Sequence, residues 1–380
     1  MRKSSIELDM PEGIRYFKSQ ISGHKIMDGE RTTGMLHTEE GRVLKPIIKQ
    51  VNGEREIMFY ESLKNSDDST TQELKKFVPD YFGIIDLQIN RTNVKYISLK
   101  DLTEGITEPC VMDIKIGKRT WDPTATEKKK EEENLKYVKS KEVYGFCITG
   151  FQVYSVFTGE LKKFDKDYGK KLDRETVVEA LKMFLNINTN NPPCRQLIMK
   201  LLSALWKIQL FFRSQRKLRF YASSLLIVYD AAGLRHCMRN QQTATLKSKL
   251  LLKRSMSLNS QENNTRQSTR GLLRSDSYCS DTVEKLCCTH SLANNFDEDL
   301  ARMKEEYGML LRELNSSSIN EENEAQNWVR VNMIDFAHVF PADELNALDI
   351  NYLEGIENLI RILEQFLPNK CSIKSTDNNI

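Results

Sequence analysis

The sequence lacks the apolar segments that membranes and secretion require. No run of eighteen apolar residues occurs among its 380 residues, and residues 1–10 carry four charged side chains instead of an apolar signal-peptide core. We therefore expect neither a membrane span nor a secretory signal, and we expect the protein in the nucleus and the cytoplasm.

Paired cysteines and excess charge are also scarce. The eight cysteines contain no CxxC pair, which argues against both a zinc site and a disulfide framework. The 56 Lys and Arg residues exceed the 53 Asp and Glu residues by only three, so charge alone gives no reason to expect a nucleic-acid partner. Any anion site must therefore be a local arrangement of basic residues.

The order of the predicted elements indicates an α+β fold with two lobes. Residues 21–103 form a β-rich N-lobe, with short strands at 25–26, 42–48 and 94–99 and one helix at 53–64. Residues 104–368 form a mixed C-lobe. Its strands are expected at 111–116, 148–157, 220–229 and 328–336, and its helices at 125–137, from 173 onward, at 195–213 and at 351–366.

One internal segment is too polar to form a packed core. Of the 27 residues from 255 to 281, 14 are Ser, Thr, Asn or Gln, which predicts a disordered insertion at 235–326 within the C-lobe. This insertion is a candidate site for protein partners. We also expect flexible ends at 1–20 and 369–380, and a monomeric chain.

Charged residues in apolar surroundings mark the candidate chemistry. Asp113 and Lys115 fall on one face of a predicted strand, and Asp335 interrupts an apolar stretch, where a carboxylate is costly without a cation. Lys45 ends a strand and Glu56 begins the next helix, a weak version of the lysine and glutamate pair of kinase nucleotide sites. The structural alternatives are a surface ion pair for Asp113 and Lys115 and a turn cap for Asp335.

Three short elements carry a family resemblance. Residues 109–117 match PxxxDxKxG, residues 223–226 match SSLL and residues 334–336 match IDF, in the order found in the inositol polyphosphate kinase family. The chain resembles that family from about residue 21 to residue 366. The resemblance implies a two-lobed fold distantly similar to protein kinases, and ATP- and Mg²⁺-dependent phosphorylation of inositol phosphate hydroxyls. A protein kinase itself is excluded, because GxGxxG, HRD and DFG elements are missing.

The resemblance assigns ATP to the N-lobe and the segment that follows it. Lys45 would hold the ATP phosphates with Glu56 as its partner, and Asp113 would lie near adenine or ribose. The hinge that receives adenine through main-chain groups would consist of Lys100, Asp101 and Leu102.

Catalysis is assigned to Lys115, Asp113 and Asp335. Lys115 would contact both the substrate and the transferred phosphoryl group, Asp335 would hold Mg²⁺, and His338 would approach the inositol phosphate. Phosphoryl transfer depends on charge neutralisation and in-line placement, so a fixed lysine and a metal-binding carboxylate supply what it needs most.

Basic residues gather after the PxxxDxKxG element, as an array of substrate phosphates requires. Residues 115–141 contain nine Lys and Arg residues against five acidic residues. Lys129 and Lys136 are seven residues apart and would share one face of a helix, and Lys166 is a further substrate candidate. The alternative is a solvated charged helix without a ligand.

Two branches of the family compete as models for the substrate. Residues 118–123 resemble the multikinase branch, which phosphorylates inositol trisphosphate and tetrakisphosphate towards the pentakisphosphate. Gln152 resembles the hexakisphosphate kinase branch, which makes diphosphates. We favour the multikinase branch. Phosphoinositide headgroups remain a further candidate substrate, and a kinase-fold scaffold that acts through its insertion remains a further alternative.

Overall fold

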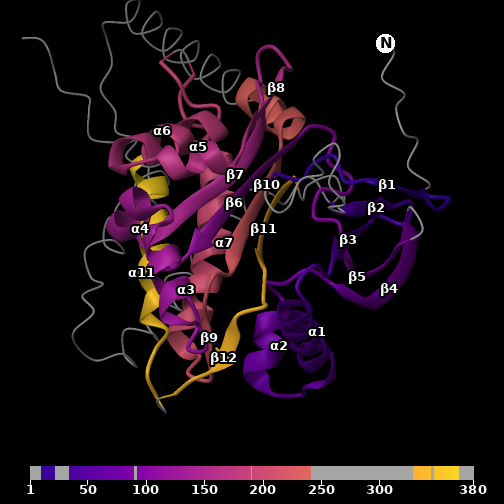
Figure 1. Ribbon diagram of the computed structural model, residues 1–380. Helices are drawn as coiled ribbons and strands as arrows, with labels where there is room; N and C mark the ends of the chain where they lie inside the picture. The colour runs from indigo at the N-terminus through magenta and orange to yellow at the C-terminus, as the bar shows by residue number, and fades with distance from the viewer. Residues whose placement is uncertain are drawn as a thin grey trace, which may run out of the picture.

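The computed structural model describes residues 10–21, 34–89, 92–189, 191–240, 328–343 and 346–367. Figure 1 shows two lobes side by side, each built around its own antiparallel sheet. Among the described residues, no helix is long and apolar enough to cross a membrane. The mixture of helices and strands and the two lobes agree with the α+β, two-lobed fold that the sequence predicts.

The first lobe is a five-stranded sheet in the order β1-β2-β3-β5-β4, with two helices. The strands and helices are β1 (Ile14–Tyr16), β2 (Leu36–Thr38), β3 (Arg42–Pro46), β4 (Tyr81–Ile89), β5 (Thr92–Lys100), α1 (Gln50–Asn65) and α2 (Ser69–Lys75).

Three expectations for this lobe need correction. Strand β1 lies in the segment 1–20, which we expected to be flexible, and it pairs with β2. Helix α2, absent from the prediction, is a short polar helix whose first turn is capped by the Asp68 side chain, which accepts a hydrogen bond from the Thr71 N–H. Strand β4 was also missed. The strand expected at 25–26 lies outside the described residues.

The second lobe is built on a sheet in the order β11-β10-β6-β7-β8. Strands β9 and β12 form a separate two-stranded sheet. The strands of this lobe are β6 (Pro109–Ile116), β7 (Phe146–Tyr154), β8 (Leu161–Phe164), β9 (Leu218–Phe220), β10 (Ser224–Asp230), β11 (Val329–Ile334) and β12 (Val339–Pro341). Its helices are α3 (Glu127–Leu135), α4 (Val138–Tyr144), α5 (Lys166–Lys171), α6 (Arg174–Phe184), α7 (Arg195–Ser214) and α11 (Ile350–Gln365).

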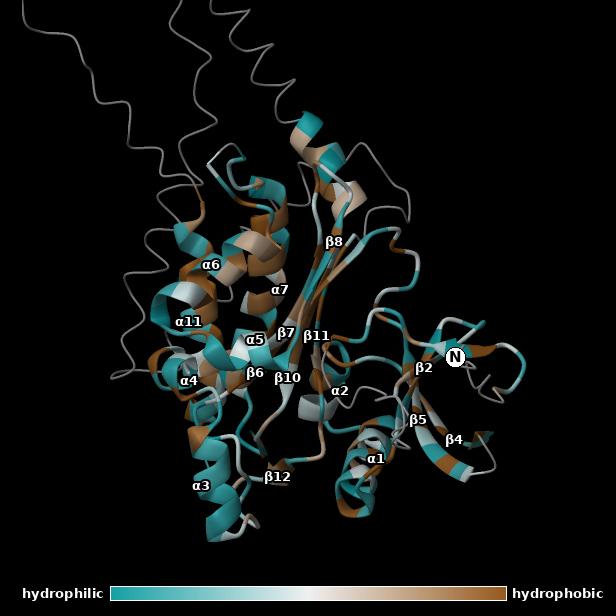
Figure 2. Ribbon diagram, turned by 45° about the horizontal axis from the view of Figure 1, so that its top comes forward, coloured by the Kyte–Doolittle hydropathy of each residue, from teal (hydrophilic) through white to brown (hydrophobic). Residues whose placement is uncertain are grey.

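One face of the second sheet points away from the first lobe. The main core lies between this face and the helices that cover it. Figures 1 and 2 place α7 and α11 on that side, and Figure 2 colours much of α7 as hydrophobic but α3 as largely hydrophilic. Met112, Ile114 and Ile116 of β6 are buried in this core. The alternate residues Val111 and Lys115 line a cavity on the opposite face. Strand β6 therefore separates the core from the cavity.

The helix expected at 125–137 is interrupted. Helix α3 ends at Leu135, and Tyr137 adopts a left-handed backbone conformation with φ 55° before α4 begins. Lys136 is the extended residue at this break, so it does not share a helix face with Lys129. The expectation of a shared face was wrong because it assumed one continuous helix.

The first residues of the insertion expected at 235–326 belong to the packed lobe. Residues 231–240 are helical, Leu234 and Cys237 are buried, and Arg235 contacts the Glu108 carboxylate. The packed lobe therefore continues to residue 240. Residues 241–326 of the predicted insertion and the tail 369–380 lie outside the described residues.

Candidate active site

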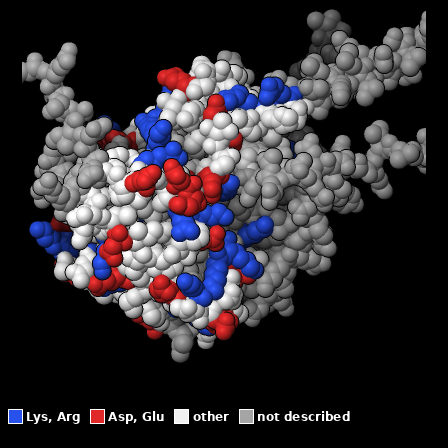
Figure 3. Space-filling model, turned by 90° about the vertical axis from the view of Figure 1, so that its right-hand side faces the viewer, with Lys and Arg blue, Asp and Glu red and all other residues white. Residues whose placement is uncertain are grey.

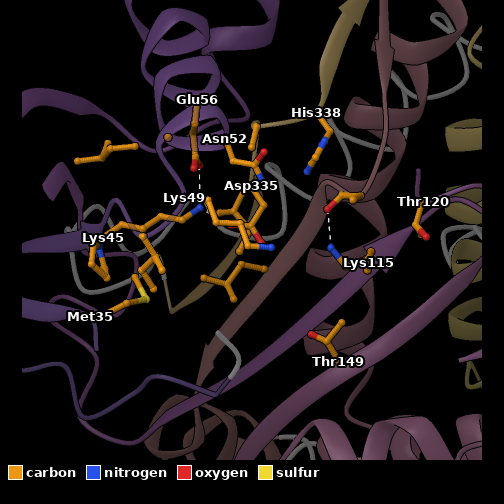
Figure 4. Close-up of a pocket in the computed structure, with 18 of the residues that line it drawn as sticks. Met35, Lys45, Lys49, Asn52, Glu56, Lys115, Thr120, Thr149, Asp335 and His338 are labelled. Atoms are coloured by element: carbon orange, nitrogen blue, oxygen red, sulfur yellow. Dashed lines mark hydrogen bonds and ion pairs between the residues drawn. The ribbon is translucent and has the colours of Figure 1, made fainter. Parts of the chain in front are cut away.

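A cavity of about 990 Å³ lies between the two lobes. Its lining includes Lys45 and Glu56 from the first lobe, Lys115 from β6, and Asp335 and His338 from the segment between β11 and β12. Figure 4 shows Lys45, Glu56 and Asp335 grouped on one side of the cavity and Lys115 and Thr120 on the other. The cavity thus gathers residues that lie almost 300 positions apart in the chain.

Lys45 is held by two carboxylates. Its Nζ donates to Glu56 Oε1 at 2.8 Å and to Asp335 Oδ1 at 2.5 Å. Burial alone would lower the pKa of Lys45, but the charges of Asp335 and Glu56 outweigh it and raise the pKa. The ammonium is therefore permanently charged and fixed. The sequence spacing suggested the pair with Glu56, and the structure adds Asp335 to it.

Asp335 and Phe336 of the IDF element lie in different environments. Asp335 has φ 65°, a left-handed conformation that is uncommon outside glycine but tolerated by aspartate, and its side chain is 39% exposed towards the cavity. Phe336 is buried and stacks on Phe59 at 4.2 Å between ring centroids. Burial would raise the pKa of Asp335, but Lys45, Lys115 and Lys166 hold it below its usual value.

The donor set fits a magnesium ion that is shared with phosphates. Within the described ranges, no group of three or more His, Cys, Asp or Glu side chains could hold a metal by itself. Mg²⁺ is commonly bound through one or two carboxylates together with substrate phosphates and waters. Asp335 can supply such a carboxylate, because its side chain reaches the cavity.

Lys115 and Asp113 lie next to each other on β6 but differ in access. Lys115 lines the cavity, and its Nζ donates to the Ala222 carbonyl at 2.6 Å. Asp113 is buried and is not among the residues that line the cavity. Its charge acts on Lys166, whose pKa is nevertheless lowered, because burial outweighs this attraction. A direct contact of Asp113 with adenine or ribose stays a prediction.

The predicted hinge lines the cavity, but the Asp101 side chain is already occupied. Its carboxylate contacts His37 Nε2 at 3.1 Å and accepts hydrogen bonds from the N–H and hydroxyl of Thr103, both at 2.7 Å. The Leu102 carbonyl accepts a hydrogen bond from Arg330, and Lys100 Nζ lies 3.5 Å from the Asp80 carboxylate. The main-chain N–H of Asp101 also donates to the Gly41 carbonyl, at 3.1 Å, so a contact of Asp101 with adenine stays a prediction.

The predicted substrate lysines lie at one end of the cavity. Lys129, Lys136 and Lys166 all line it. The ammonium groups of Lys129 and Lys136 meet at Glu133 Oε1, at 2.7 and 2.8 Å. The two lysines therefore converge through a shared carboxylate and not through a shared helix face.

Two further basic residues at this end were not predicted. Lys141 and Lys170 also line the cavity. Lys141 is almost fully buried, and its Nζ donates to the Glu133 carbonyl at 2.6 Å. The only signal for Lys141 in the sequence was the excess of basic residues over 115–141, which does not single out a position, and Lys170 lies outside that range.

A buried aspartate that the sequence did not single out holds His338. Asp122 Oδ2 lies 2.5 Å from His338 Nδ1 and 3.4 Å from Arg55. The Thr124 hydroxyl and N–H donate to its other oxygen. Burial would raise the pKa of Asp122, but its hydrogen bonds with Thr124 and His338 lower it. The signal that could have found Asp122 was its place within the stretch 118–123, next to a proline.

The basic residues of the cavity do not belong to a broad basic surface on the face that Figure 3 shows. On that side of the molecule, Lys and Arg are interspersed with Asp and Glu. The residues described on that face therefore form no broad basic patch, in line with the small net charge of the whole chain.

Comparisons with known proteins agree on one family. The family model described as inositol polyphosphate kinase matches residues 96–364. Human inositol polyphosphate multikinase is 30% identical over an alignment that covers 92% of this chain and 88% of the human protein. Mouse inositol hexakisphosphate kinase 2 is 34% identical, but over only 37% of this chain and 31% of the mouse protein.

One solved structure supports the fold. The crystal structure of inositol phosphate multikinase from S. cerevisiae, in complex with ADP and Mn²⁺, superimposes with a TM-score of 0.50. It covers 86% of this chain and 99% of the yeast chain, at 18% sequence identity. At that identity the similarity concerns the arrangement of the chain only.

Proposed function

The chain belongs to the inositol polyphosphate kinase family, and from this premise we propose that it is a multikinase that phosphorylates inositol trisphosphate and tetrakisphosphate with ATP and Mg²⁺. One observation carries the proposal: a single cavity holds the Lys45, Glu56 and Asp335 cluster at one end and a group of lysines at the other. Lys115 and Lys166 both lie close enough to Asp335 for their charges to act on it, so the two groups of residues adjoin each other within the cavity.

The two ends suit the two substrates of a phosphoryl transfer. Lys45, fixed between two carboxylates, provides a positive charge for the ATP phosphates, and Asp335 would bind the Mg²⁺ that shields them. Lys115 is placed to neutralise charge on the group that moves between ATP and the acceptor hydroxyl. No nucleophilic side chain is needed, because the substrate hydroxyl attacks directly.

His338 would orient the acceptor. It lines the cavity together with Lys115, and Asp122 holds its Nδ1. An imidazole fixed at one nitrogen presents the other in a defined direction, here to a hydroxyl or phosphate of the inositol ring. Asp122 is thus a positioning residue that acts through His338.

The second candidate, a hexakisphosphate kinase, loses its sequence argument. Gln152 is only 2% exposed, and its side-chain amide donates to the Pro109 carbonyl at 2.8 Å, within the second sheet. It is not among the residues that line the cavity. Its resemblance to the hexakisphosphate kinase branch therefore has no direct bearing on the substrate.

Product analysis separates the candidates. The purified full chain is incubated with ATP, Mg²⁺ and one inositol phosphate at a time, or with vesicles that contain a phosphoinositide, and the products are resolved by ion-exchange chromatography. A multikinase converts trisphosphate through tetrakisphosphate to pentakisphosphate and leaves hexakisphosphate largely unchanged. Rapid formation of a diphosphate with little trisphosphate turnover would favour the second candidate. No turnover of any of them would favour a scaffold.

A further inference from the structure

One acidic side chain lies among the lysines of the substrate end. Glu133, near the end of α3, lines the cavity beside Lys129 and Lys136 and contacts both of their ammonium groups through one oxygen, Oε1. The Thr120 hydroxyl donates to the other oxygen, Oε2, at 3.3 Å. A carboxylate is unexpected in a site that must bind an array of phosphates, because the two carry charge of the same sign.

Glu133 is fixed in place and stays ionised. Its side chain is 17% exposed, and its main-chain carbonyl accepts the buried Lys141 ammonium at 2.6 Å. Burial would raise the pKa of Glu133, but Lys129 and Lys136 lower it to about 2. At neutral pH the carboxylate is therefore a permanent negative charge at the lysine end of the cavity.

A hydroxyl and a phosphate would meet this carboxylate very differently. A ring hydroxyl can donate a hydrogen bond to it, and a hydrogen bond to an ionised acceptor is among the stronger ones. A phosphate group carries about −1.5 to −2 charge at pH 7 and would compete with Glu133 for the same two ammonium groups. A phosphate at this position is repelled unless Glu133 breaks its contacts with both Lys129 and Lys136.

We propose that Glu133 is a specificity-determining residue, which reserves one ring position of the bound inositol phosphate for a free hydroxyl and disfavours a fully phosphorylated ring. This inference rests on the proposed function and deepens it, since it names the feature of the substrate that the site selects. It also gives a physical reason for a kinase of this family to leave hexakisphosphate unphosphorylated.

Two ligands that differ by one phosphate test the inference. Inositol pentakisphosphate has one free hydroxyl, and hexakisphosphate has none. Binding of each to the full chain is measured by calorimetry for the wild type and for Glu133→Gln, which keeps the size of the side chain and an oxygen for the lysines. The matched control is Glu132→Gln, which removes the same charge from an exposed neighbour that does not line the cavity.

The expected result is a reversal of preference. The wild type and Glu132→Gln should bind pentakisphosphate more tightly than hexakisphosphate, by about tenfold, although hexakisphosphate carries more charge. Glu133→Gln should bind hexakisphosphate more tightly. General electrostatic attraction cannot give this pattern, because it favours the more charged ligand in every variant.

Three results would overturn the inference. Glu133→Gln could keep the wild-type preference, Glu132→Gln could reverse it equally, or the wild type could already prefer hexakisphosphate. Equal weakening of both ligands in Glu133→Gln belongs to the first of these, and would show that Glu133 only positions Lys129 and Lys136. A wild type that binds neither ligand would instead contradict the proposed function, and this inference with it.

Discussion

Replacing Asp335 by Asn tests the catalytic end of the cavity most directly. The substitution removes one negative charge at nearly constant volume. The amide oxygen of the new side chain can still accept the hydrogen bond from Lys45, and Lys45 also keeps Glu56 at 2.8 Å. The fold should therefore survive, and the effect should appear in the reaction.

The size of the effect follows from the charge that is lost. Two unit charges about 4 Å apart interact by about 4 kcal/mol at the effective dielectric of a partly solvated site. The Asp335 side chain is 39% exposed, so solvent screens part of this interaction. A loss of about 2.7 to 4 kcal/mol in the transition state corresponds to a fall in kcat of roughly 10²- to 10³-fold.

The assay measures kcat at saturating ATP and trisphosphate over a range of Mg²⁺ concentrations. A metal ligand also predicts that half-maximal activity requires about tenfold more Mg²⁺ in Asp335→Asn. The control is Asp86→Asn, an exposed change on β4 that is not part of the cavity lining. A kcat within about threefold of the wild type would refute both roles of Asp335. A lower kcat with an unchanged Mg²⁺ requirement would leave Asp335 as a partner of Lys45 only.

Two other variants address substrate binding. Lys129→Ala combined with Lys136→Ala should raise KM for trisphosphate by roughly 10²-fold with little change in KM for ATP, because each charge-assisted hydrogen bond contributes about 1.5–3 kcal/mol. The exposed pair Lys128→Ala and Lys139→Ala is the control, and a comparable loss there would reduce the effect to net charge. Asp122→Asn should lower kcat by about 10- to 100-fold, because the imidazole it holds loses a charged partner, again on the scale of one such bond. Its KM for ATP should stay unchanged, and a normal kcat would rule out the positioning role.

The elements that the sequence predicts best are those with a strong apolar period and a clear start. Helix α6 begins after Asp173, whose side chain caps Thr176 in a capping box, as its sequence predicts. Helices α7 and α11 carry apolar residues at helical spacing and are buried in the main core. Local pattern and tertiary burial agree for these elements, so reading the sequence alone suffices.

The missed elements lack such agreement. Strands β4 and β8 form the edges of their sheets, and α2 is a single polar stretch capped by Asp68. β8 and α2 bury few side chains, so their sequences carry a weak apolar signal. The sequence of β4, YFGIIDLQI, is apolar and aromatic, but most of its side chains alternate between half-buried and exposed. The break at Tyr137 was also invisible, because a left-handed residue with a bulky side chain is set by tertiary contacts and not by local preference.

Some residues of the candidate site could likewise be predicted from local sequence, and others could not. Each of Lys45, Glu56, Lys115 and Asp335 could be named from a local motif or family element, but the contact between Lys45 and Asp335 spans 290 positions and exists only in the folded chain. Asp122 and Glu133 escaped notice for a different reason. Their function depends on the cations beside them, and an isolated carboxylate in a charged stretch reads as solvated surface.

These contacts explain how a chain with a net charge of only +3 can hold a highly anionic ligand. Three of the cavity lysines already contact carboxylates of the protein: Lys45 contacts Glu56 and Asp335, and Lys129 and Lys136 share Glu133. Because these partners fix the ammonium groups before any ligand arrives, less side-chain entropy is lost on binding. A ligand must also compete with the internal carboxylates, so binding strength depends on where its phosphates lie and not only on how many it has. The same internal acids that keep the lysines ordered can therefore make the site selective.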